Sequence, residues 1–179
     1  QLDVFQKPKV LVAAPSSKIL GNMLGHTDIL DYFYKKGYDV MHITSKFGAI
    51  INDKKVGREE FFTTLQEWGA DDTRKFVIFH YSILSEGINV PGLTHTILLR
   101  NLPIVEMAQT IGRVIRVHKD DRAAVSEGRI PAGAFHLYKK QEGVVTMPTG
   151  YKMGNAIAAR LQNVVNAIFI EGIPPLSYC

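Results

Sequence analysis

Two arginines, Arg113 and Arg116, have a spacing that places them on the same face of a predicted helix. The helix spans residues 103–116, and Gln109 and Gly112 fall on the same face because all four positions recur every three or four residues. Guanidinium groups stay charged and bind phosphate oxygens through two parallel hydrogen bonds. The pattern therefore predicts a site for a phosphate-bearing ligand, with both arginines pointing away from the core.

Gly112 argues against an ordinary solvated basic face, which is what paired arginines on a helix usually form. A glycine inside a helix costs about 1 kcal/mol relative to alanine. That cost is easier to understand if a ligand approaches the helix backbone closely. The opposite face of the helix is apolar and is expected to pack on the core, through Ile104, Met107, Ala108, Ile111, Val114 and Ile115.

Short apolar runs alternate with longer helical patterns, which is typical of a parallel sheet covered by helices. Strands are predicted at residues 9–14, 38–43, 75–80, 95–99 and 134–138, and helices at 28–36, 58–68, 103–116 and 153–171. Residues 45–57 and 119–131 are predicted to be loops. We expect one α/β domain over residues 1–150. Residues 151–179 are expected to form a C-terminal helix and tail that pack on the domain or dock on a partner.

The composition is that of an ordinary globular protein with a mild basic bias. Of the 179 residues, 46% are hydrophobic and 21% are charged, and the net charge of +4 permits a nucleic-acid partner without demanding one. The single cysteine, Cys179, predicts a reducing, cytoplasmic compartment. No apolar run approaches the roughly 18 residues of a membrane span, so no membrane partner is expected.

A second segment, residues 85–92, reads Ser-Glu-Gly-Ile-Asn-Val-Pro-Gly and lies between the third and fourth predicted strands. Open α/β sheets bind ligands at the carboxyl ends of their strands, and glycines let the backbone approach a ligand. Taken alone, this segment is an ordinary connection between strands. The segment becomes significant as a candidate functional motif because the arginine helix follows the next strand.

Together, the two segments resemble motifs V and VI of superfamily 2 helicases and translocases. The motif V segment is residues 85–91, and the motif VI segment is residues 109–116, Gln-Thr-Ile-Gly-Arg-Val-Ile-Arg. The resemblance covers residues 9–138 and implies the second, C-terminal RecA-like domain, which is a three-layer α/β sandwich with a mainly parallel sheet. The glutamine that opens motif VI is closest to the phage UvsW-like and restriction-translocase branches, which leaves a phage-encoded protein as one possibility.

The resemblance implies roles for particular residues. Arg113 and Arg116 would be arginine fingers that reach the γ-phosphate of ATP, and Gln109 would couple the nucleotide to the partner domain. The nucleotide side of the cleft would be lined by Glu86, Gly87, Asn89 and Gly112. Many members of this superfamily have aspartate where this chain has Asn89, whose amide can bind a ribose hydroxyl but cannot form an ion pair.

Polar residues also follow the first and second predicted strands, where relatives touch the phosphate backbone of a nucleic acid. These residues are Ser16, Ser17, Lys18, Thr44, Ser45 and Lys46. For the first three, a capped helix start is an equally good interpretation. The expected partner is the phosphate backbone of DNA, with RNA as the second choice.

Two motifs of such ATPases are absent from this sequence. There is no Gly-x-x-x-x-Gly-Lys-Ser/Thr phosphate loop and no acidic box to hold Mg²⁺. In helicases of this kind, both belong to the first RecA-like domain, which would bind most of the ATP and Mg²⁺. We therefore expect an N-terminal RecA-like domain of the same polypeptide as a partner, and no ATP hydrolysis by this chain alone.

Two alternatives stay open. Residues 10–17 and 35–40 also resemble the opening of a sugar-nucleotide glycosyltransferase with Rossmann-like halves, although this does not explain residues 109–116. A non-catalytic interaction module with a RecA-like fold is the other alternative. The histidines show no metal-ligand spacing, so no metal site is expected, and Lys139 and Lys140 are predicted to be solvated.

Overall fold

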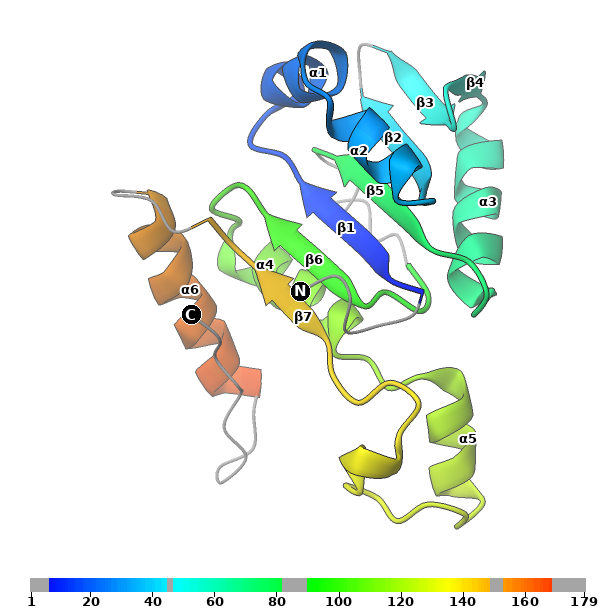
Figure 1. The fold of residues 1–179 in the computed structure, drawn as a ribbon. Coiled ribbons are helices and arrows are strands. Elements are labelled where there is room, and N and C mark those ends of the chain that lie inside the picture. Colours follow the sequence, from blue (N-terminus) through cyan, green and yellow to red (C-terminus); the bar gives the residue numbers. More distant parts are fainter. Residues whose placement is uncertain (1–6, 45–46, 82–89, 149–152, 169–179) are drawn as a thin grey trace.

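The computed structural model describes residues 7–44, 47–81, 90–148 and 153–168 (Figure 1). A seven-stranded sheet forms its centre, with the strand order β4-β3-β2-β5-β1-β6-β7. The strands are β1 (Lys9–Ala13), β2 (Asp39–Thr44), β3 (Gly48–Ile51), β4 (Lys54–Val56), β5 (Phe76–His80), β6 (His95–Leu98) and β7 (Val144–Thr146). The helices are α1 (Ser17–His26), α2 (Ile29–Lys35), α3 (Arg58–Ala70), α4 (Ile104–Val114), α5 (Lys119–Ser126), α6 (Met153–Ile168) and the 3₁₀ helix η3 (Phe135–Leu137).

Five neighbouring strands run parallel to one another, in the order β2, β5, β1, β6 and β7. Strand β1 lies between β5 and β6, and Val12 pairs with Phe79 on one side and Ile97 on the other. All five residues of β1 are buried, as are all five of β5. Burial on both faces of the sheet explains why these strands read as continuous apolar runs. The predicted α/β class with a mainly parallel sheet is confirmed.

Apolar side chains fill both faces of the sheet. On one face, Phe61 and Leu65 of α3 pack with Leu11 of β1. On the other face, Leu20 of α1 and Phe33 of α2 belong to a second buried cluster. Figure 1 shows α1 and α2 together in front of the sheet, with α4 behind it. The sheet is therefore covered on both sides, as an α/β sandwich requires.

Residues 48–56 form a β-hairpin, so the prediction of a loop over residues 45–57 is wrong for this part. Strand β3 pairs antiparallel with β2, and β4 pairs antiparallel with β3. The turn residues Asn52 and Asp53 have φ angles of 45° and 63°, the left-handed region that tight two-residue hairpin turns use. Lys54 and Lys55 lie exposed on the edge strand, where charged residues discourage pairing with another chain.

The predictions for residues 119–138 are also wrong. The predicted charged loop contains helix α5, whose N-cap His118 accepts a hydrogen bond from the backbone amide of Asp120. The predicted fifth strand, residues 134–138, contains the 3₁₀ helix η3, and Gly133 before it has a φ of 85°. The strand beside β6 is instead β7, which begins at Val144. In Figure 1, α5 and η3 extend below the sheet.

The C-terminal helix α6 packs on α4. Its Ile157 and Val164 are buried in one cluster with Met107 and Ile111 of α4. Arg160 also donates a hydrogen bond of 2.6 Å to the backbone carbonyl of Leu102, just before α4. The last three residues of the predicted helix, 169–171, lie outside the described residues. No helix within the described ranges has both the length and the apolar character that crossing a bilayer requires.

Candidate functional site

Helix α4 is seated on the core through one face, as its sequence pattern predicts. Met107, Ile111 and Val114 are at most 2% exposed. Ile104, expected on the same face, is the first residue of the helix and is 52% exposed. The helix ends at Val114, so Arg116 lies beyond it rather than on it, and the expected helix boundary at residue 116 is wrong.

Arg113 does not point away from the core, and this part of the prediction is wrong. It is only 9% exposed, and its neighbour in the fold is His80, the last residue of β5. The rotation of α4 that buries Thr110, Ile111 and Val114 also turns Arg113 toward the sheet. Burial, followed by the charge of Arg116, lowers the pKa of the Arg113 guanidinium.

His80 is fully buried and uncharged at neutral pH. Burial is the main cause, and the charges of Arg100 and Arg113 add to it, so that the pKa of His80 falls to about 3. Arg100 itself forms an ion pair of 3.3 Å with Glu106 in the first turn of α4. Two arginines, Arg100 and Arg113, therefore lie near the carboxyl end of β5.

Several buried nitrogens at this edge lack a hydrogen-bond partner within the described residues. They include both ring nitrogens of His80 and the Nη1 atom of Arg113. Buried polar atoms almost always have partners, and leaving one without a partner costs about 1–3 kcal/mol. A phosphate oxygen is the natural partner for an unpaired guanidinium donor. The chemistry of this edge thus fits an anionic ligand.

Arg116, Gln109 and Gly112 complete the segment that resembles motif VI. Arg116 and Gln109 are exposed, and Arg116 is close enough to influence the pKa of Arg113. A Cβ atom added to Gly112 would meet nothing within 4 Å in the described structure. No contact within the described chain explains the glycine, which leaves room for a ligand or another domain above this turn.

The residues expected to line the nucleotide, Glu86, Gly87 and Asn89, lie outside the described residues. Their roles stay predictions. The exit from this segment is closely packed against α3, since a Cβ atom on Gly69 would lie 2.5 Å from Pro91 Cγ.

The predicted nucleic-acid contacts fall at the ends of β1 and β2. Ser16 is the N-cap of α1 and accepts a 3.1 Å hydrogen bond from the Ile19 amide, which is the capped helix start considered as the alternative. Ser17 and Lys18 lie in the first turn of α1, and Lys18 is exposed. Thr44 ends β2 and is 7% exposed. Ser45 and Lys46 lie outside the described residues.

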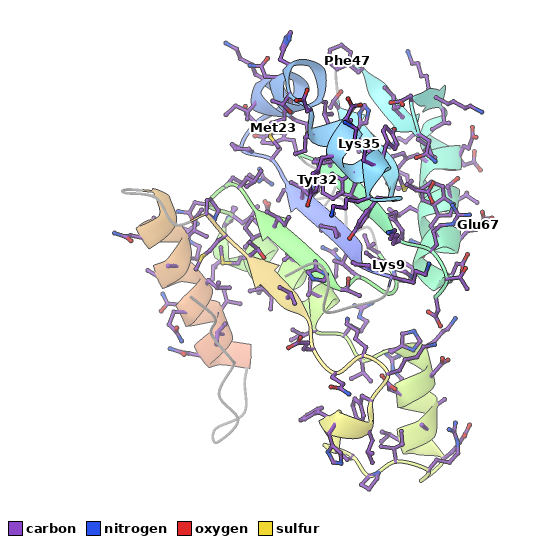
Figure 2. The ribbon with its side chains drawn as sticks, viewed as in Figure 1. Lys9, Met23, Tyr32, Lys35, Phe47 and Glu67 are labelled. Carbon is purple, nitrogen blue, oxygen red and sulfur yellow. The ribbon has the colours of Figure 1, made fainter. Side chains whose placement is uncertain are left out.

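The structure brings α1 and the end of β2 together. Phe47 donates its backbone amide to Thr44 Oγ1 at 2.9 Å. A Cβ atom on Gly21 of α1 would lie 3.5 Å from the Phe47 ring, and Figure 2 shows Phe47 beside this helix. Lys18 and Thr44 therefore belong to one end of the sheet, although strand β5 separates their strands.

A group that the sequence did not reveal lies elsewhere in the fold, because its members are far apart in the chain. Ligand atoms of Asp72, His118 and Asp120 lie within 4.8 Å of one another. The Lys139 ammonium pairs with Asp72 at 2.7 Å and with Asp120 at 3.0 Å. Burial opposes ionisation of Asp72, but hydrogen bonds from Lys139 and His118 outweigh it and lower the pKa of Asp72 to about 2. The ammonium already balances the carboxylates, so the group ties α5 to the loop before β5.

Lys140 is partly buried, so the prediction that it is solvated is wrong. Its ammonium donates hydrogen bonds to three backbone carbonyls, those of Leu93, Val114 and Arg116. Burial, followed by the charge of Arg116, lowers the pKa of Lys140 to about 8, so the group is still charged at neutral pH. Two of the three carbonyls belong to the end of the arginine helix and the residues just after it.

Comparison with known proteins addresses the fold. No protein family and no curated protein matches this chain by sequence. A solved structure of the C-terminal domain of S. cerevisiae Dbp5, there bound to Gle1 and IP6, aligns with a TM-score of 0.52 over 96% of this chain and 78% of that one. This chain has an α/β RecA-like fold. The sequence identity is 12%, and the likeness gives no support to the phage UvsW-like or restriction-translocase branches.

Proposed function

We propose that this chain is the second RecA-like domain of an ATP-dependent helicase or translocase. The observation that carries the proposal is Arg113, a guanidinium that is 9% exposed and has an Nη1 atom without a partner in the described structure. It lies at the carboxyl edge of the sheet, where open α/β folds place their ligands. The fold shared with the C-terminal domain of Dbp5 supports this setting.

In this proposal, ATP and Mg²⁺ bind mainly to a first RecA-like domain, and this chain supplies Arg113 and Arg116 across the shared cleft. The arginines neutralise negative charge that develops on the transferred phosphoryl group. In GTPases, such a finger raises the rate by about 10³- to 10⁵-fold. Arg113 is buried near the carboxyl end of β5, while Arg116 is exposed and lies two residues beyond the end of α4. Gln109 couples the bound nucleotide to the first domain.

The nucleic-acid grip is proposed for the ends of β1 and β2. Lys18 offers an exposed charge there, and Ser17 offers a hydroxyl group, whereas Thr44 is buried and its Oγ1 already accepts the Phe47 amide. Ser16 contributes less than the sequence suggests, because its hydroxyl already caps α1. Contacts to phosphates do not distinguish one base sequence from another, and the binding affinity that they provide falls steeply as the salt concentration rises. DNA is proposed over RNA on the motif resemblance alone.

The test is Arg116→Ala in a protein that joins this chain to its first RecA-like domain. We expect ATP turnover to fall by about 10³-fold or more, while ATP affinity stays within a few fold, because a finger acts on the transition state. Arg122→Ala is the matched control, since Arg122 is an exposed arginine on α5. Unchanged turnover in the Arg116 variant would remove this residue from the mechanism.

A further inference from the structure

The C-terminal end of α4 is held by a segment that returns from much later in the chain, and this contact carries a further inference. We propose that Lys140 is a positioning residue that holds Arg116 in place for its work at the nucleotide. The catalytic part of this inference rests on the proposed function of Arg116. The contact itself stands on the geometry around Lys140.

The ammonium of Lys140 has three N–H donors, and the structure provides three acceptors. The Leu93 carbonyl lies 2.7 Å from Nζ and the Arg116 carbonyl 3.0 Å, and the Val114 carbonyl is the third acceptor. The last carbonyls of a helix have no partner within the helix and form the negative end of its dipole. Lys140 therefore caps α4 and also binds the backbone of Arg116, two residues further on.

The backbone of Lys140 is itself fixed by α5. Asp121, in the first turn of α5 and 3% exposed, accepts hydrogen bonds from the backbone amides of Lys139 at 2.7 Å and Lys140 at 3.0 Å. Helix α5 begins only a few residues after Arg116, with His118 as its N-cap. The chain thus leaves Arg116, forms α5, and returns to Lys140, whose ammonium binds the backbone carbonyl of Arg116.

Gly143 secures the other side of Lys140. A Cβ atom on this glycine would collide with the backbone carbonyl of Val114 and lie 2.7 Å from the Val114 Cγ1 atom. Only a glycine lets the chain pass so close to the end of α4. Immediately afterwards, Val144 enters β7 and pairs with His95 of β6. Lys140 is thus pinned between Asp121 and the sheet, and it has little freedom to release its carbonyls.

Arg116 depends on this support because it lies outside α4. A residue past the end of a helix has no intrahelical hydrogen bond to fix its backbone. A displacement of about 1 Å in a group that acts on the transition state can cost on the order of 10² in rate. Lys140 should therefore influence the turnover number for ATP far more than the Michaelis constant, without itself touching the nucleotide.

The first experiment measures the contact directly and needs only the chain described here. Trypsin cleaves after Arg116, at the bond whose carbonyl Lys140 holds. In Lys140→Met, which keeps the stem and removes the ammonium, we expect cleavage at this bond to accelerate on the order of tenfold, as for the loss of one to two hydrogen bonds to a charged group. Lys139→Met, which breaks only the ion pairs to Asp72 and Asp120, should leave the rate within about twofold.

The second experiment measures function in the protein joined to its first RecA-like domain. Lys140→Met should lower the turnover number on the order of tenfold to a hundredfold, with little change in the Michaelis constant for ATP. The wild-type rate should also fall as pH rises past about 8, where Lys140 loses its charge, because burial, Arg116 and Lys9 lower its pKa more than Asp121 raises it. The variant should lack this alkaline fall.

The outcomes separate this inference from the proposed function. If Arg116→Ala abolishes turnover but Lys140→Met changes neither cleavage nor turnover, the positioning role is overturned and the proposed function stands. An equal effect of Lys139→Met would also overturn it, because general destabilisation would then explain both. If Lys140→Met does not fold, Asp121→Asn serves in its place, since it loosens the Lys140 backbone while keeping the side-chain shape. If Arg116→Ala leaves turnover unchanged, the catalytic part falls with the proposed function.

Discussion

Arg113 and Arg116 carry the same charge in different surroundings, which suits them to different parts of the proposed function. Arg113 is buried beside His80, which stays neutral mainly because it is fully buried, with the charges of Arg100 and Arg113 adding to this. Arg116 is exposed, and its backbone carbonyl accepts a hydrogen bond from Lys140. A buried arginine is already desolvated and oriented, so it can meet a phosphate at little further cost. An exposed one can follow the movement of a second domain.

Gly112 offers a test at the scale of one residue. Because a Cβ atom there meets nothing within 4 Å, Gly112→Ala should stabilise the isolated chain by roughly 0.5–1 kcal/mol, which urea unfolding would measure. In the protein joined to its first domain, the same change should lower ATP turnover by crowding the nucleotide side of α4. The control is Gly25→Ala in α1, which also meets nothing within 4 Å and should leave turnover unaltered. A Gly112 variant that is more stable and fully active would contradict the expectation.

Helix α5 and the segment after it act as one element in support of α4. Asp121 fixes the backbone at Lys140, and the ion pairs of Lys139 tie α5 to Asp72 before β5. The segment between α4 and β7 is therefore held at the end of α4 mainly through Asp121 and Lys140, while the exposed ion pairs of Lys139 add little.

Gly143→Ala tests this bracing at the scale of elements. The added methyl group would meet the Val114 backbone, so the strand leading into β7 or the end of α4 must shift. We expect a loss of about 1–3 kcal/mol in unfolding free energy, the usual cost of overpacking, measured by chemical denaturation. The exposed Gly25→Ala is again the comparison, because it adds a methyl group without a clash. Equal stability of the two variants would show that the segment is not held closely against α4.

At the scale of the whole molecule, the sheet gathers the candidate residues at the carboxyl ends of its parallel strands. His80 ends β5, Thr44 ends β2, and Ser17 begins the helix after β1. One edge thus carries both the buried Arg113 and the proposed grip on a nucleic acid. A domain of this kind can couple changes at the nucleotide to changes at the strand it holds.

The isolated chain should bind ATP only weakly, because most nucleotide contacts are proposed to lie on the first RecA-like domain. Isothermal titration calorimetry of this chain with ATP and Mg²⁺ would measure the affinity. We expect a dissociation constant on the order of a millimolar, about −4 kcal/mol, which suits a site with arginines but no phosphate loop. Micromolar affinity would contradict the shared cleft and would require a complete nucleotide site within this chain.

Much of the central sheet could be predicted from local sequence. The apolar runs that become β1 and β5 are continuous, and Phe61 and Leu65 have helical spacing. The elements that were missed lack such signals. The β3–β4 hairpin has short strands with exposed lysines. Helix α5 is rich in charged residues, and one of its two buried residues is the charged Asp121. Phe135 and Leu137 looked like a buried strand, but both are exposed in η3.

The sequence by itself determined the arginine helix, since the periodicity of residues 109–116 is local and needs no knowledge of the fold. Only the tertiary structure decided which arginine is buried. That depends on how α4 is rotated over Ala13 and Leu98, which sequence spacing leaves open. The tertiary structure also decided what holds Arg116, because Lys140 lies 24 residues away in the chain. Hydrogen bonds from a lysine ammonium to backbone carbonyls produce no periodic pattern in the sequence, so only the folded structure reveals them.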